Sequence, residues 1–284
     1  MCENCNLDQR KADLSVLMSV YVKEKPEYLR ECFESLLNQT VLAKEWVIVE
    51  DGPLTVQLHG VLDEYQNKYP GLIKRVPLKQ NMGLGLALKE GILNCSYEMV
   101  ARMDTDDICV PERFEKQLSE FEKDSKLDIC GSHIIEFENN IDNVLSKRNV
   151  PLTNDEIVQY HRRRSAYNHM TVMFKKTTVF RAGNYEHAPL MEDDMLWTRL
   201  ILAKAKGMNI DDYLVYARTG LAMIERRGGY SYFKKYKASR KKVYQLGLAS
   251  SWDYIYTLLV QFIVALLPKK IRILFFVGFL RKDK

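Results

Sequence analysis

The chain has 284 residues, of which 46% are hydrophobic and 28% are charged, a composition typical of a globular protein and not of a disordered one. This length allows one large α/β domain with an appendage. The net charge of +5 hides a sharp division, because residues 226–284 carry 14 Lys and Arg against two Asp, whereas residues 1–225 are acidic overall. A basic tail on an acidic body indicates a separate partner for the tail.

Residues 1–13 form a polar N-terminal segment, in which we expect no secretory signal peptide. The six cysteines are scattered along the chain, as is typical of reduced thiols in a cytoplasmic protein.

From Leu14 onward, segments typical of strands and of helices alternate along the chain. A buried strand is expected over residues 14–22, and a helix begins at Pro26 with its apolar side chains on one face. Three further pairs follow, with strands over 45–51, 72–78 and 99–104 and helices over 55–69, 84–95 and 111–124. Four β-α units in succession predict a mostly parallel sheet with right-handed crossovers. Beyond Leu127 we expect strands at Asp128–Glu138 and Val172–Phe174, and a helix from about Glu192.

Acidic side chains follow three of the expected strands. Glu24 lies just beyond the first strand, which ends at Tyr21, and the second strand ends in Glu50 and Asp51. The fourth strand ends in a cluster of three acids, Asp104, Asp106 and Asp107. Because ligands of such sheets bind outside the carboxyl ends of the strands, these groups should share one site.

Several chemistries compete for this aspartate cluster. A helix N-cap needs only one aspartate, and it would lie closer to Pro111. A calcium loop of the EF-hand type fails, because its fifth and sixth positions would be Ile108 and Cys109. A solvated acidic turn fits poorly after so apolar a strand. A site for a hard divalent cation, Mg²⁺ or Mn²⁺, remains, in which carboxylates and a substrate phosphate supply the oxygen ligands.

Five segments in order carry a family resemblance: "SVLMSVYVKEKPEYLRECFESLLNQT", "WVIVEDGP", "NMGLGLALKEGI", "RMDTDDICVPERF" and "LMEDDMLWTRL". Together they resemble the inverting glycosyltransferases of family 2. The resemblance implies a GT-A fold, a Rossmann-like α/β architecture with a mostly parallel central sheet flanked by helices. It runs from about Leu14 to Gly229, and we expect the catalytic domain over residues 14–225.

The resemblance also implies a role for each matching position on the donor side. Asp51 would pair with a uracil-like base, and Tyr21 and Glu24 would line the nucleoside pocket. Asn81 and Gly83 belong to the segment near the donor. The two aspartates of the D-x-D segment have different roles. Asp104 would lie near the ribose or the sugar, and Asp106 would hold the metal. Asp107 is expected to be structural, tying its loop to the helix near Pro111.

On the acceptor side, the resemblance makes Asp193 the general base, with Glu192 beside it as a candidate substrate contact. The alternative is that these acids stabilise the N-terminus of a helix. His169 is a candidate contact to acceptor or donor sugar, or else a structural histidine. Arg226 and Arg227 could bind a diphosphate or face lipid headgroups.

The tail, residues 226–284, combines basic and apolar segments. Its apolar runs, Tyr254–Leu267 and Ile271–Leu280, are each too short for a membrane-spanning helix, which needs about 20 residues. Apolar helices bracketed by Lys and Arg are typical of segments that lie in the interface of an anionic membrane. A core helix over Tyr254–Leu267 and a re-entrant hairpin of both runs remain alternatives. Nucleic acid is disfavoured as a partner by the adjoining apolar runs.

These features predict a glycosyltransferase that is peripheral to the cytoplasmic face of the bacterial inner membrane. It would move one sugar from a nucleotide sugar, with a UDP-sugar favoured, to a lipid-linked saccharide in surface polysaccharide synthesis. Two alternatives stay open. A sugar-phosphate nucleotidylyltransferase should carry a glycine-rich loop after the first strand, which "SVYVKEKPEY" lacks. The other is a membrane-associated protein that binds nucleotides without catalysis.

Overall fold

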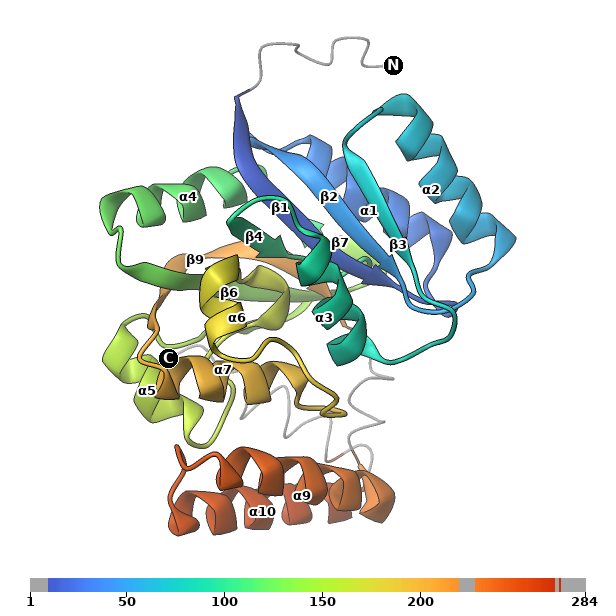
Figure 1. The fold of residues 1–284 in the computed structure, drawn as a ribbon. Helices are drawn as coiled ribbons and strands as arrows, with labels where there is room; N and C mark the ends of the chain where they lie inside the picture. Colours follow the sequence, from blue (N-terminus) through green and yellow to red (C-terminus); the bar gives the residue numbers. More distant parts are fainter. Residues whose placement is uncertain (1–9, 220–227, 269–270, 272–284) are drawn as a thin grey trace.

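The computed structural model describes residues 10–219, 228–268 and 271, and Figure 1 shows how they are arranged. Within these residues, nine strands form one sheet with helices on both of its faces. The strand order is β3-β2-β1-β4-β8-β6-β9-β5, and β7 pairs with β6 outside this path. The strands are β1 (Lys11–Val20), β2 (Leu42–Glu50), β3 (Ile73–Pro77), β4 (Met99–Arg102), β5 (Ile108–Cys109), β6 (Leu127–Glu138), β7 (Asn140–Arg148), β8 (Met173–Lys175) and β9 (Lys206–Arg218).

The N-terminal half of the sheet confirms the expected parallel arrangement. β1 lies between β2 and β4 and is parallel to both, and β2 is parallel to β3. The carboxyl ends of β1, β2 and β4 therefore lie at one edge of the sheet. The first strand begins at Lys11, three residues earlier than expected, so the end of the polar N-terminal segment already belongs to the sheet. The helices of this half are α1 (Pro26–Leu37), α2 (Val56–Lys68), α3 (Leu84–Asn94) and α4 (Arg113–Lys123).

Local sequence explains where these helices begin. Pro26 opens α1, a position at which the missing N–H of proline costs nothing. The Thr55 side chain caps α2 by accepting the N–H of Leu58 at 3.2 Å. Gly83 precedes α3 with φ at 85°, a backbone conformation that residues other than glycine rarely adopt.

The C-terminal half of the sheet mixes both strand directions. β8 is antiparallel to β4 and β6, whereas β6 is parallel to β9 and antiparallel to β7. The sequence did not predict β5, β7 or β9, nor the short helices α5 (Asn154–His161) and α6 (Lys176–Arg181). The expected helix at Glu192 is confirmed as α7 (Glu192–Leu202).

Apolar side chains fill both faces of the sheet. On one face, α1, α2 and α4 pack through residues such as Phe33, Leu62 and Phe114. On the other face, α3, α6 and α7 pack through residues such as Leu88 and Trp197. β4 lies between these two layers, which explains why the strand before the aspartate cluster is so apolar.

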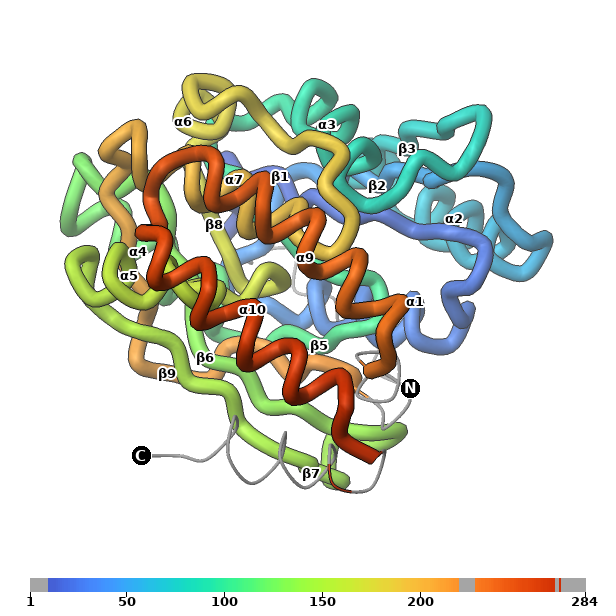
Figure 2. Tube along the Cα trace, turned by 90° about the horizontal axis from the view of Figure 1, so that it is seen from below, coloured from blue at the N-terminus to red at the C-terminus, as the bar shows by residue number. Residues whose placement is uncertain are grey.

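In the described part of the basic tail, α9 (Gly229–Gln245) and α10 (Ser251–Leu266) lie side by side beyond α7 (Figures 1 and 2). Asp253 closes a capping box with Ser250 at the start of α10. The same carboxylate accepts a hydrogen bond from Arg163 at 2.6 Å and forms an ion pair with Arg162 at 3.2 Å, so it fastens α10 to the end of α5.

Among the described residues, no helix is both long enough and apolar enough to cross a membrane. The first apolar run of the tail is confirmed as helical, and it packs on α9 and the Arg162–Arg163 corner and not on the sheet. The second run lies outside the described residues except for Ile271.

Candidate active site

The carboxyl ends of β1, β2 and β4 enclose a cleft of about 750 Å³. Every residue that the sequence assigned to the donor lines this cleft, together with Asp107 and Arg218. These residues are Tyr21, Glu24, Asp51, Asn81, Gly83, Asp104 and Asp106. Segments more than 80 residues apart in the chain are thus brought together because their strands are neighbours and parallel.

Asp51 organises one wall of the cleft. Its carboxylate accepts the backbone N–H groups of Met82 at 2.6 Å and Gly83 at 3.1 Å, and the Asn81 side chain at 3.0 Å. A carboxylate has about four acceptor positions, so one remains for a ligand donor. Gly52 allows this loop to approach closely, because a Cβ there would lie 2.5 Å from the Asn81 nitrogen.

Glu24 connects the loop after β1 to the aspartate cluster. It accepts a hydrogen bond from the Thr105 hydroxyl at 2.8 Å, and Thr105 stands between Asp104 and Asp106. Burial raises the pKa of Glu24. The Glu24 side chain therefore helps to position the cluster, and Tyr21, which is partly exposed, lines the same cleft.

Asp104, Asp106 and Asp107 bring their carboxylate oxygens within 4.8 Å of one another. Burial and the neighbouring charges of Asp104 and Glu24 raise the pKa of Asp106 to about 7. Burial, with Asp106 and Asp104 beside it, holds the pKa of Asp107 well above its usual value. Three crowded, desolvated carboxylates form an oxygen donor set of the kind that a hard divalent cation prefers.

The structural role expected for Asp107 agrees with its contacts, but its partner differs from the expectation. It accepts the backbone N–H of Arg218 on β9 at 2.7 Å, and is 2% exposed. The expected partner, the helix near Pro111, begins at Arg113 as α4. The expectation was wrong because β9, which brings position 218 to this loop, was not predicted.

Two arginines that the sequence did not single out surround the cluster. Arg218 donates from Nε to the Asp106 carbonyl oxygen at 2.9 Å, and its guanidinium stacks on Tyr28 at 3.9 Å. Arg102, only 1% exposed, forms an ion pair with Asp104. The positive charge of Arg102 also stabilises the ionised form of Glu192. The buried guanidinium of Arg102 thus interacts both with the aspartate cluster and with Glu192, the first residue of the acidic pair Glu192–Asp193 on α7.

The acidic pair occupies the first turn of α7, where a helix N-terminus favours negative charge. Asp193 and Asp194 line a second cleft of about 1450 Å³ that is walled by α9 and α10. Burial, followed by the charges of Asp194 and Glu192, raises the pKa of Asp193 to about 8. A carboxyl with so high a pKa is suited to accept a proton near neutral pH.

The model of the family described as glycosyl transferase family 2 matches residues 15–187, which is more than half of the chain. The chain belongs to glycosyl transferase family 2. The match begins within β1 and ends just before α7, so it includes most of the lining of the first cleft, and it makes the chain a glycosyltransferase.

Relatives of this glycosyltransferase share much of its length. An uncharacterized glycosyltransferase of Haemophilus influenzae is 44% identical, over 94% of this chain and 99% of its own. The amylovoran biosynthesis glycosyltransferase AmsE of Erwinia amylovora is 43% identical, over 83% and 85%. The UDP-Gal:alpha-D-GlcNAc-diphosphoundecaprenol beta-1,3-galactosyltransferase of Escherichia coli is 35% identical, over 91% and 93%.

Solved structures share the fold at low sequence identity. TarS of S. aureus in complex with UDP superposes with a TM-score of 0.61 at 17% identity, over 88% of this chain and 70% of its own. The mannosyltransferase PcManGT from Pyrobaculum calidifontis, in complex with GDP-Man and Mn²⁺, gives 0.62 at 14% identity, over 92% and 72%. The chain therefore shares its fold with these two structures.

The remaining predicted residues of this glycosyltransferase lie elsewhere. His169 lines neither cleft; its Nε2 is 2.8 Å from the Tyr185 hydroxyl, and its ring packs on Trp197. Burial, aided by the charge of Arg102, holds the pKa of His169 well below its usual value, so the ring is neutral. Its contact to a sugar stays a prediction. Arg226 and Arg227 lie outside the described residues.

Proposed function

We propose that this glycosyltransferase moves a single sugar from a nucleotide sugar to a lipid-linked saccharide, with inversion at the anomeric carbon. The observation that carries the proposal is the position of the acidic pair on α7. Asp193 faces the second cleft, while Glu192 is close enough to the donor cluster for the charge of Asp104 to raise its pKa, along with burial. A donor in the first cleft and an acceptor in the second would therefore meet at this pair.

The donor is proposed to be a UDP-sugar. Asp51, held by the 81–83 loop, has an acceptor position left for the imide N–H of uracil. Tyr21 and Glu24 would flank the nucleoside, and Asp104 would lie near the ribose or the sugar. The UDP complex of TarS and the UDP-galactose donor in the name of the Escherichia coli relative support this choice.

Asp106 is proposed to hold a divalent cation, Mn²⁺ or Mg²⁺, on the diphosphate. When bound, the cation neutralises the charge that builds on the nucleoside diphosphate as it leaves. Asp107 and Glu24 keep the backbone around Asp106 in place, Asp107 through Arg218 and Glu24 through Thr105. The Mn²⁺ complex of PcManGT supports a metal in this fold.

Asp193 is proposed to be the general base. It would take the proton of the acceptor hydroxyl while that oxygen forms a bond to the anomeric carbon and the bond to the diphosphate breaks. One displacement of this kind inverts the configuration. Glu192, paired electrostatically with Arg102, would orient the acceptor sugar.

The tail is proposed to hold the enzyme on anionic lipid at the cytoplasmic face of the bacterial inner membrane, where it would act in surface polysaccharide synthesis. α10 exposes apolar side chains at helical spacing, from Trp252 (65% exposed) to Leu266 (67% exposed). α9 beside it exposes five lysines, Lys234, Lys235, Lys237, Lys241 and Lys242. An apolar stripe beside lysines is typical of interfacial helices. The polysaccharide enzymes among the relatives support the pathway.

The test is a transfer assay with the full chain, Mn²⁺, a panel of UDP-sugars and a GlcNAc-diphosphate acceptor with an undecyl chain. We expect nucleotide release that depends on acceptor and metal, and a product of inverted configuration by NMR. Asp193→Asn should abolish release while leaving UDP binding unchanged. Release that persists in Asp193→Asn, or a product that retains the configuration of the donor, would contradict the mechanism.

A further inference from the structure

The second cleft is larger than the catalytic step requires. It has a volume of about 1450 Å³, and its walls are the 148–152 segment, the end of α5, the start of α7, and the facing sides of α9 and α10. Asp193 lies on one side, and Tyr256 and Val260 of α10 lie on another. A ligand that fills this cleft would reach from the acidic pair to the helix that carries the exposed apolar stripe.

The polar lining of this second cleft contains five arginines and five carboxylates. The guanidinium groups come from three separate elements, namely Arg148 at the end of β7, Arg162, Arg163 and Arg164 after α5, and Arg240 on α9. Two of the carboxylates are engaged by the protein itself: Asp253 is bound by Arg162 and Arg163, and Glu156 accepts the backbone N–H of Thr153 at 3.0 Å. An anion in this cleft is therefore within reach of guanidinium groups from three elements.

The lining also contains polar atoms that the described residues do not satisfy. Nε of Arg240 has no hydrogen-bond partner among them, although the side chain is only 2% exposed. Asp194 Oδ1 and Gln261 Nε2 on α10 also have no hydrogen-bond partner among the described residues. Buried polar groups are normally paired, so these atoms indicate that the cleft receives a polar ligand.

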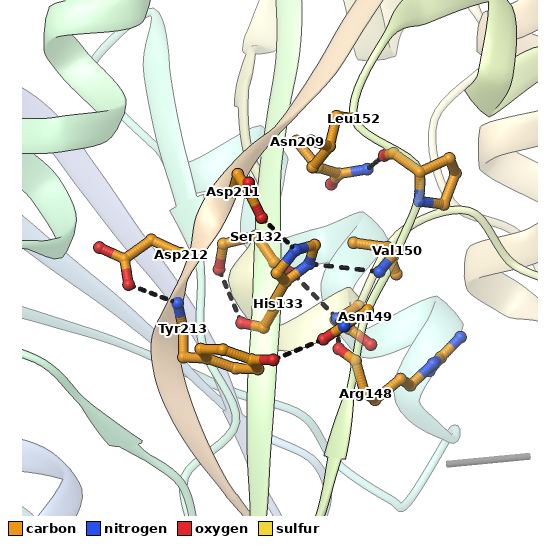
Figure 3. Close-up of polar contacts among 12 residues, drawn as sticks. Ser132, His133, Arg148, Asn149, Val150, Leu152, Asn209, Asp211, Asp212 and Tyr213 are labelled. Atoms are coloured by element: carbon orange, nitrogen blue, oxygen red, sulfur yellow. Dashed lines mark hydrogen bonds and ion pairs between the residues drawn. The ribbon is translucent and has the colours of Figure 1, made fainter. Parts of the chain in front are cut away.

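The wall that carries Arg148 is held firmly, as Figure 3 shows. His133 on β6 accepts the Val150 N–H at 3.2 Å through Nδ1, and its Nε2 lies 3.1 Å from Asp211. Asn209 on β9 donates its side-chain amide to the Pro151 carbonyl at 2.6 Å. Hydrogen bonds on both sides of the segment therefore fix the place from which Arg148 enters the cleft.

Arg148 is close to the acidic pair. Burial raises the pKa of Asp193, and the charge of Arg148 acts on it in the opposite direction. The cleft thus combines a carboxylate with a nearby guanidinium group, further guanidinium groups, and the side chains of Tyr256 and Val260 on α10. A lipid-linked saccharide carries a matching set of groups, namely a sugar hydroxyl, a phosphate-bearing link and a hydrocarbon chain.

We propose that the arginines of this cleft bind the diphosphate of the lipid-linked acceptor, with its sugar at Asp193 and its hydrocarbon chain along α10. The inference rests on the proposed function and specifies where the acceptor is held. Guanidinium groups suit the site because they bind phosphate oxygens through two parallel hydrogen bonds and remain charged at every relevant pH. The donor diphosphate has its own place at Asp106 in the first cleft.

The first experiment measures binding without turnover. Undecyl diphosphate is titrated calorimetrically into the full chain and into Arg148→Gln and Arg164→Gln. Each variant loses charge-assisted hydrogen bonds, so the Kd should rise by roughly tenfold to a hundredfold. Arg181→Gln is the matched control, because Arg181 is exposed on α6 and lines neither cleft. All variants should bind UDP as the wild type does, which shows that they are folded. Equal affinity of all variants for undecyl diphosphate would overturn the proposal.

The second experiment separates an acceptor diphosphate from a membrane headgroup. Binding to phosphatidylglycerol vesicles without any lipid diphosphate should be the same for the wild type, Arg148→Gln and Arg164→Gln. If both variants lose vesicle binding but keep their affinity for undecyl diphosphate, the arginines bind headgroups and the proposal is wrong.

The third experiment keeps this inference distinct from the proposed function. Transfer to GlcNAc-diphosphate-undecyl should show a KM that rises in both arginine variants, whereas the KM for the donor stays constant. If both variants transfer sugar at the wild-type rate with an unchanged acceptor KM, the arginines do not bind the acceptor diphosphate. The proposed function would still stand. Undecyl diphosphate binding through the arginines, in a protein that turns over no nucleotide sugar, would contradict the proposed function alone.

Discussion

Arg218 fixes the backbone at Asp106, because its Nε donates to the Asp106 carbonyl oxygen at 2.9 Å from the opposite side of the cleft. Its other guanidinium nitrogens bind the Asn139 carbonyl oxygen and Glu31, and its ring partners are Tyr28 and Phe137. Residues 106 and 218 meet only because β5 pairs with β9. The proposed metal ligand thus depends on a side chain that contributes no ligand itself.

Arg218→Lys should therefore weaken metal use while keeping the positive charge. A lysine cannot donate the several hydrogen bonds that the planar guanidinium makes in fixed directions. The loss of such support for a metal ligand typically lowers metal affinity or activity by about tenfold to a hundredfold. The measurement is the concentration of Mn²⁺ that gives half-maximal transfer. Arg30→Lys, at an exposed ion pair with Glu64, is the control and should not change it. An unchanged Mn²⁺ requirement in Arg218→Lys would show that Arg218 does not support metal binding at Asp106.

Metal binding itself should depend on pH. Since the pKa of Asp106 is raised to about 7 by burial and by Asp104 and Glu24, protons compete with the cation below that pH. Mn²⁺ affinity should rise between pH 6 and pH 8, as measured by calorimetry in the absence of donor. In Asp106→Asn, the affinity should be low and nearly independent of pH over this range. A wild-type affinity that stays flat from pH 6 to pH 8 would contradict the metal assignment.

Activity should increase with pH through the titration of Asp193. Its pKa of about 8, which results from burial and the charges of Asp194 and Glu192, leaves a minority of the carboxyl ionised at pH 7. The rate at saturating metal should rise through pH 8, where about half of the carboxyl is ionised, and level off about one pH unit higher. Removing the base in Asp193→Asn should lower kcat by about 10²-fold to 10⁴-fold. A pH profile that falls between pH 6 and pH 8 would exclude Asp193 as the base.

The same pKa has a consequence for stability. An aspartate whose pKa is higher in the folded than in the unfolded state binds more protons when folded, so it lowers stability as pH rises from about 4 to about 8. Asp193→Asn does not titrate there. The Tm of the variant should exceed that of the wild type by a margin that grows over this range. A constant margin would mean that the Asp193 carboxyl is not perturbed.

Gly85 provides a test of how the donor helix α3 is coupled to α7. A Cβ at Gly85 would overlap the Glu186 carbonyl oxygen and lie 3.0 Å from the Glu192 Cβ. Gly85→Ala should therefore displace the acidic pair, destabilise the fold by about 1–3 kcal/mol and reduce kcat. Gly60→Ala in α2 is the matched control, since a Cβ there meets nothing within 4 Å. That variant should be more stable than the wild type by about 0.5–1 kcal/mol.

The outer side of α10 should carry membrane binding. The double variant Leu259→Glu with Ile263→Glu places two charges on the exposed apolar stripe, where both side chains are more than half exposed. Flotation with anionic vesicles should drop at least tenfold, because each buried charge costs more than the apolar contact it replaces. Val56→Glu, an isolated exposed apolar residue on α2, is the control. Equal flotation of the double variant and the wild type would contradict the membrane assignment of the tail.

The gathering of the strand-end residues in the first cleft could be predicted from sequence because it depends on neighbouring parallel strands. Apolar runs bounded by Pro26, Gly52 and Gly83 marked β1, β2 and α3, and acids at strand ends then had to converge. The residues that support the cluster could not be found in this way. Arg218 is the last residue of β9, which carries Asp211 and Asp212 in its middle, so the alternation of apolar and polar residues typical of a strand is broken. The chain distance of 112 residues between Arg218 and Asp106 gave no further signal.

The second cleft could not be predicted for a different reason. The tail was recognised by its basic and apolar composition, and this composition indicates a surface but not a docking position. The position depends on ion pairs from Asp253 to Arg162 and Arg163, which lie 90 residues or more away in the chain. β7, with side chains that are mostly exposed, likewise lacks the buried face that would have marked it as a strand.

Asp253 both caps the first turn of α10 and attaches this helix to Arg163. Burial raises its pKa, but hydrogen bonds from Ser250 and Arg163 outweigh this effect and hold the pKa well below the usual range, so the carboxylate stays charged. One oxygen caps the first turn while the other is bound by Arg163 of the catalytic domain. A single carboxylate therefore both caps the first turn of α10 and ties that turn to Arg163, so replacing Asp253 would remove both contacts at once.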